Sequence, residues 1–140
     1  MSLARTAART AALAVAGCAL AGVASDAGLK RRLKLLATTE KRHADAWAEL
    51  LTRGGVKLPD RQPRLTAQAL AALARVAGIG PALALAGAAE GQVLRAYLGQ
   101  VATVSDPGAQ GVLRSVLPEE LDQTALRLRP IFERLSRENV

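Results

Sequence analysis

A carboxylate and the only histidine of the chain lie three residues apart, at Glu40 and His43. Side chains at this spacing project to the same side of a helix, so one oxygen and one nitrogen could bind the same metal ion. Both positions fall on an apolar helical stripe, whose other members are Leu29, Leu33, Leu36, Trp47 and Leu50. Ionisable groups are costly there unless they are paired or bind a metal. The stripe therefore predicts either a hydrogen-bonded core pair or part of a metal site.

Two further acidic positions lie in apolar surroundings. Glu90 interrupts a second stripe, formed by Leu83, Ala86, Val93, Tyr97 and Val101. Glu119 and Glu120 follow Pro118, where the dipole at the start of a helix would favour acids without any site. Tyr97 and Trp47 are predicted to be packing residues, not redox relays.

Composition favours an all-α fold. Half of the 140 residues are hydrophobic, with one Phe, one Trp and one Tyr. The apolar residues are mainly Ala, Leu and Val, and Ala and Leu are strong helix formers, whereas aromatic residues, common in strands, are scarce. The length suits a single domain over residues 1–140. One cysteine excludes an internal disulfide and a multi-cysteine zinc site.

Local signals delimit the helix that carries Glu40. Ser25 or Asp26 can cap its start, because either side chain accepts from backbone N–H groups of the first turn. Gly54 and Gly55 favour an end after Arg53. Pro59 and Pro63 are expected to keep the following linker extended.

Three further helices are predicted after the linker. Thr66 is expected to cap a short helix over 67–77, with Leu70, Leu73 and Val76 on its apolar side. Pro81 suits the first turn of a helix reaching residue 104. The last helix starts near Ser105 or Asp106, and its prolines, Pro118 and Pro130, should kink or restart it.

The first segment, residues 3–24, has two interpretations. Its basic start and small residues resemble a secretory signal, and residues 15–18 match a lipoprotein box ending at Cys18. Its uncharged run is short and rich in alanine, which argues against a membrane span. A helical stripe favours a first bundle helix, through Leu13, Ala16, Leu20 and Val23. We therefore expect a cytoplasmic protein, with an exported or lipid-anchored one as the alternative if residues 1–24 are a signal.

The order and spacing of these motifs resemble ferritin-like, rubrerythrin-type four-helix bundles, especially the ferritin-like domains found ahead of vacuolar-iron-transporter-like proteins in bacteria. The matching stretches are 24–30, 36–44 with Trp47, and 73–78 before Glu90 and Tyr97. The resemblance implies an antiparallel four-helix bundle, here with a short extra helix between helices 2 and 3 and a kinked last helix. In that family each of two helices gives one Glu to a di-metal site, and each of the other two gives a Glu-x-x-His motif.

Carried over by motif, the resemblance assigns Glu40, His43, Glu90 and Glu120 as metal ligands. The motif is degenerate. No Asp or Glu precedes Asp26, so the helix 1 carboxylate is missing near Arg9 and Thr10, and Gln123 stands in place of the second histidine. Four ligands could hold one iron, manganese or zinc ion, whereas two-metal oxygen chemistry is disfavoured. An arginine near the vacant position could instead pair with the remaining carboxylates.

The formal charge of +7 is spread over several segments. No aromatic residues interleave with the basic ones, so nucleic acid is a disfavoured partner. Peripheral contact with an anionic membrane through the basic N-terminus is a third, weaker hypothesis. No other catalytic motif is present, and enzymatic activity is left open.

Two functions follow as expectations. The first is a divergent ferritin-like protein with a reduced carboxylate and histidine metal site and at most weak iron handling or redox activity. The alternative is a metal-free helical module that forms a homo-oligomer or binds a protein partner, because small residues on helix faces permit close association.

Overall fold

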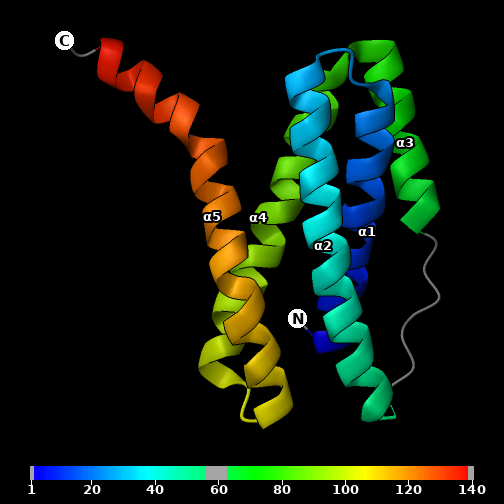
Figure 1. The fold of residues 1–140 in the computed structure, drawn as a ribbon, viewed down its shortest axis with the longest axis vertical. Helices are drawn as coiled ribbons and strands as arrows, with labels where there is room; N and C mark the ends of the chain where they lie inside the picture. Colours follow the sequence, from blue (N-terminus) through cyan, green and yellow to red (C-terminus); the bar gives the residue numbers. More distant parts are fainter. Residues whose placement is uncertain (1, 56–62, 139–140) are drawn as a thin grey trace. The chain divides into compact units, whose positions relative to one another are not determined.

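Five helices make up the described part of the chain: α1 (Leu3–Val23), α2 (Ala27–Arg53), α3 (Pro63–Ala77), α4 (Ile79–Thr103) and α5 (Pro107–Glu138) (Figure 1). The computed structural model describes residues 2–55 and 63–138, with side chains for 2–55 and 67–123. These ranges contain no strand. The predicted all-α class is confirmed.

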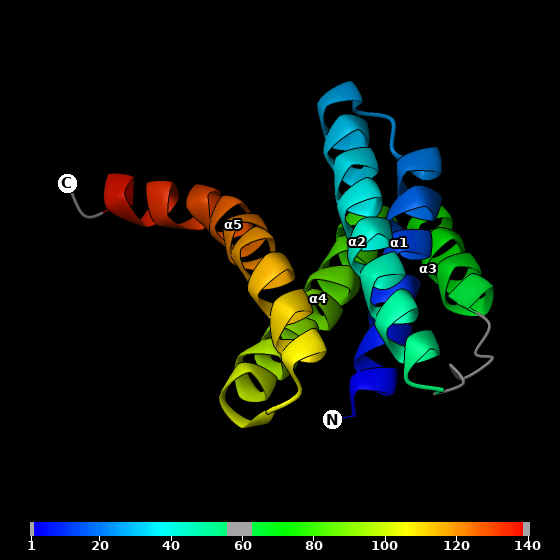
Figure 2. The ribbon, with the colours of Figure 1, turned by 60° about the horizontal axis from the view of Figure 1, so that its bottom comes forward.

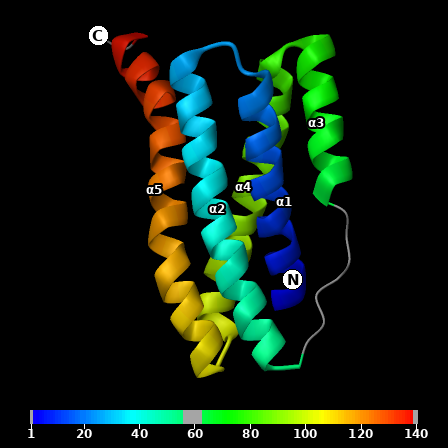
Figure 3. The same ribbon diagram turned by 45° about the vertical axis from the view of Figure 1, so that its right-hand side comes forward.

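The chain divides into two compact units, Met1–Ala96 and Tyr97–Val140, whose boundary falls within α4. In the first unit, α1 lies against both α2 and α3 (Figure 3). In the second, the Gln110 side chain closes the turn between α4 and α5 by donating to the backbone oxygens of Val101 and Val104. The antiparallel four-helix arrangement of the whole chain stays a prediction.

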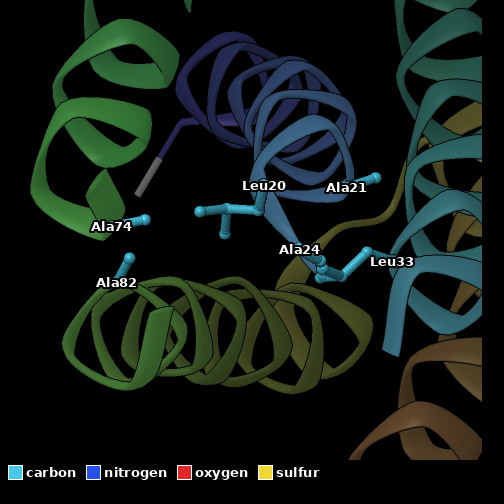
Figure 4. Packing of buried hydrophobic residues seen from close by; sticks show 6 residues of the cluster. All are labelled: Leu20, Ala21, Ala24, Leu33, Ala74 and Ala82. Carbon is cyan, nitrogen blue, oxygen red and sulfur yellow. The ribbon is translucent and has the colours of Figure 1, made fainter. Parts of the chain in front are cut away.

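Alanine and leucine side chains build the core at one end of the first unit. The cluster joins the end of α1, the start of α2, the end of α3 and the start of α4 (Figure 4), through Leu20, Ala21, Ala24, Leu33, Ala74 and Ala82. Nearby, α1 and α2 approach so closely that a Cβ placed on Gly17 would lie 3.1 Å from the Cβ of Ala37. This close approach of the two backbones determines which face of α2 lies against α1.

The helix ends follow local sequence rules. Asp26, and not Ser25, caps α2, because its Oδ2 accepts from the Leu29 N–H at 2.7 Å. Gly54 is the C-cap residue, and Gly55 takes φ +74°, a conformation that glycine adopts without a steric penalty. Asp106 accepts from the Ala109 N–H at the start of α5 in the same way. The predicted bounds of α2 are therefore confirmed at both ends.

The start of α3 was predicted wrongly, and its apolar side was predicted correctly for Leu70 and Leu73 but not for Val76. The helix begins at Pro63, so Thr66 is not its cap and Pro63 is not part of an extended linker. Proline suits a first helical position, where its missing N–H would have no helical partner. Val76 is 89% exposed, whereas Leu70 and Leu73 pack against the core beside three buried alanines, Ala67, Ala71 and Ala74. Pro59 lies outside the described residues.

Prolines do not interrupt α5. The helix continues through Pro118 and Pro130, so neither restarts it. It bends along its length, as predicted for a helix that lacks backbone donors at these positions (Figure 2). Leu121, three residues after Pro118, is 46% exposed.

The first segment forms a single helix, and Leu13, Ala16 and Leu20 are buried as its stripe predicts. Among the described helices, α1 is long and apolar enough to cross a membrane, and half of its apolar window is buried within the protein. Its length as a whole helix therefore does not exclude a span, contrary to the argument from the uncharged run alone. Core helices of soluble proteins and N-terminal signals share these properties.

Candidate metal centre

The inner face of α2 carries two ionisable side chains into the protein. Glu40 is fully buried and His43 is 2% exposed. They share this face with Leu33, Ala37 and Trp47, all buried. The sequence pattern that placed Glu40 and His43 in an apolar stripe is thus confirmed.

The distance between the two groups is informative about what they can bind. His43 Nδ1 lies 3.8 Å from Glu40 Oε2. This exceeds the length of a direct hydrogen bond, which is below about 3.2 Å for N–H···O. Two atoms that each lie about 2.1 Å from one ion are at most about 4.2 Å apart. The pair therefore has a spacing that both ligands of a single ion can have.

The outer face of α2 carries two exposed ion pairs, which differ from the buried Glu40 and His43 pair. Lys41 and Asp45 form an exposed pair at 2.9 Å. Arg53 and Glu49 form a second exposed pair one helical turn apart. Such pairs contribute little because water screens them. A buried carboxylate has no such screening, so its surroundings must compensate its charge.

Glu90 lies on the buried side of α4 in the same unit and is 7% exposed. Val93, one turn further, is fully buried, as the predicted stripe requires. Between them, exposed Gln92 accepts a hydrogen bond from the Arg9 guanidinium at 3.0 Å, which ties α1 to α4. Arg9, suggested as a partner for the remaining carboxylates, thus has an amide partner on α4.

At that vacant position α1 offers a hydroxyl. Thr10 is fully buried, and its Oγ1 donates to the backbone oxygen of Thr6 at 2.9 Å. A hydroxyl engaged with its own helix is a weak ligand compared with a carboxylate. The described part of α1 accordingly contributes no acidic group to a site.

Glu120 is the inward residue of the acidic pair on α5. It is fully buried, whereas Glu119 is only partly so. Glu40, His43 and Glu120 are three buried side chains of the types that could hold a metal ion. Oxygen and imidazole donors suit iron, manganese or zinc, and do not select one of them.

Several buried polar residues were not predicted: Thr6, Thr10, Thr39 and Gln100. Thr6 and Thr10 lie one turn apart and in register with Leu13, so helical periodicity alone could have placed them on the inner face.

Comparisons with protein families, with curated proteins and with solved structures found no match to this chain.

Proposed function

We propose that this chain is a divergent ferritin-like protein with a reduced metal site, in which Glu40 and His43 bind one iron, manganese or zinc ion. The observation that carries the proposal is the buried spacing of 3.8 Å between His43 Nδ1 and Glu40 Oε2. The resemblance in motif order adds Glu90 and Glu120 as carboxylate ligands. Water would complete the coordination shell.

The donor set limits the chemistry. One bound ion with one imidazole and up to three carboxylates can store or exchange a divalent metal. The bridging carboxylates needed on both sides of a two-metal centre are missing, because α1 has Thr10 where such a residue would be sought. At most weak iron handling follows from this set.

Metal content tests the proposal directly. Purified protein should take up close to one ion per chain, measured by plasma mass spectrometry after dialysis against Fe²⁺, Mn²⁺ or Zn²⁺. Glu40→Gln and His43→Gln should each lose most of it. Asp45→Asn is the matched control, because it removes an exposed carboxylate from the outer face of the same helix.

Thermal unfolding supplies an independent measure. A metal that binds only the folded state raises the free energy of unfolding by about 2.7 kcal/mol when its free concentration is about one hundred times Kd. The wild type and Asp45→Asn should gain this stability, and the two site variants should not. Retention of metal by both site variants would refute the assignment.

The metal-free alternative has its own support. Large apolar side chains are exposed in the first unit, at Leu35, Val76 and Leu85, with exposed fractions of 68%, 89% and 55%. A helical module that associates with itself or a partner would cover them. Light scattering that shows a stable monomer at micromolar concentration would argue against a homo-oligomer.

A further inference from the structure

The first unit gathers basic side chains at the end built around the cluster of Leu20, Leu33 and Ala74. Leu29 and Leu33 of α2 pack in one cluster with Leu73 and Ala74 of α3. The residues next to them in sequence therefore lie at the same end of the unit. The connection from α1 to α2 and the connection from α3 to α4 are seen at this end (Figure 1). We call this the basic end, and it comprises Lys30, Arg31, Arg32, Lys34 and Arg75.

Acidic residues do not balance this charge. Asp26 is the only acidic residue between positions 10 and 39, and residues 61–89 contain none. The Asp26 carboxylate already accepts from the Leu29 N–H as the cap of α2. On the second half of α2, by contrast, Lys41 and Arg53 each have an acidic partner. Within α2, the imbalance is thus found at the basic end.

Helix stability does not explain the cluster. Lys30 and Lys34 lie four residues apart, and like charges at this spacing destabilise a helix. The first turn of α2 also contains no acid, although the helix dipole favours one there. A binding role accounts for charges that the fold itself does not need.

Large apolar side chains accompany the basic ones. Leu35 is 68% exposed directly after Lys34, and Val76 is 89% exposed directly after Arg75. Aromatic side chains that could stack on nucleic acid bases are not exposed in the part of the chain with described side chains, since Trp47 and Tyr97 are fully buried. Basic residues next to aliphatic ones suit the headgroups and acyl boundary of an anionic lipid surface.

We propose that the basic end docks on an anionic membrane surface, with Lys30, Arg31 and Lys34 contacting lipid headgroups and Leu35 and Val76 inserting at the acyl boundary. This function does not depend on the metal site. Each basic residue near such a surface raises the partition coefficient by about fivefold, and salt weakens the attraction.

Vesicle co-sedimentation of the full chain tests the proposal. Wild-type protein should bind phosphatidylcholine vesicles containing about one-fifth phosphatidylserine, and should not bind pure phosphatidylcholine. The triple variant Lys30→Gln, Arg31→Gln, Lys34→Gln should lose about two orders of magnitude in partition coefficient. The matched control removes three basic residues elsewhere in the unit, Lys41→Gln, Arg53→Gln and Arg95→Gln, and should retain most binding. Circular dichroism checks that both variants stay helical.

A second variant separates lipid from an acidic protein as the partner. Leu35→Ser with Val76→Ser should weaken vesicle binding and leave binding to polyglutamate unchanged. Equal loss in the triple variant and its control would overturn the proposal, because net charge alone would then explain binding. Binding to polyglutamate in preference to vesicles would also overturn it, as would vesicle binding that ignores both salt and the triple variant.

Discussion

Gly17 lies where α1 closely approaches Ala37 of α2. A Cβ at this position would stand 3.1 Å from the Cβ of Ala37, tighter than ordinary van der Waals contact. We expect Gly17→Val to destabilise the protein by about 1–3 kcal/mol, because the added methyl groups force two helices apart. Chemical denaturation followed by the fluorescence of Trp47, buried in the same unit, measures this change.

A glycine without such a neighbour serves as the control. Gly91 lies within α4, and a Cβ there would meet nothing within 4 Å. Gly91→Ala should raise stability by about 0.5–1 kcal/mol, because alanine loses less backbone entropy in a helix. If both substitutions destabilised equally, close approach at Gly17 would not be the cause.

At the scale of the helix, a single side chain sets where α2 begins. The Asp26 carboxylate accepts from the Leu29 N–H at 2.7 Å, whereas Ser25 lies one residue too early to do so. Asp26→Ala should cost about 1 kcal/mol, the usual value of an N-cap, and Ser25→Ala should change stability by less than about 0.5 kcal/mol. Thermal unfolding of the two variants measures these changes in stability. A larger loss of stability for Ser25→Ala than for Asp26→Ala would contradict the assignment of Asp26 as the cap.

Local rules explain why most helix ends could be predicted from the sequence. Asp26, Gly54 and Asp106 act through backbone groups within a few residues, so their effect does not depend on the rest of the fold. The full inner face of α3 could not be predicted in this way. Leu70 and Leu73 pack against the core as their spacing predicts, yet Val76 is exposed and Ala71 and Ala74 are buried, because tertiary packing decides which part of an apolar stripe is covered.

Only part of the candidate site could be predicted from the sequence. Glu40 and His43 were predictable because they share one helix, whose period fixes their side and spacing. Which carboxylate of α5 is buried could not be predicted, because Glu119 and Glu120 are adjacent and only tertiary packing distinguishes them. The burial of Thr10, by contrast, follows from its helical register with Leu13.

For the molecule as a whole, the contribution of α5 to metal binding is open to a direct test. Trp47 belongs to the first unit and Glu120 to the second, so the fluorescence of Trp47 reports on a unit that does not contain the substituted residue. If Glu120 is a ligand, Glu120→Gln should lower the stability that added Mn²⁺ gives to the Trp47 transition. A tenfold loss of affinity removes about 1.4 kcal/mol of that stability at saturating metal.

Glu119→Gln is the control for this measurement, because it makes the same chemical change at the neighbouring, partly exposed position. It should leave the stabilisation by Mn²⁺ unchanged. Equal behaviour of the two variants would remove Glu120 from the ligand set and leave Glu40 and His43 with Glu90 in the first unit. Loss of stabilisation in Glu120→Gln alone would mean that metal binding couples the second unit to the first, because a ligand that binds the folded state stabilises every element that supplies a donor.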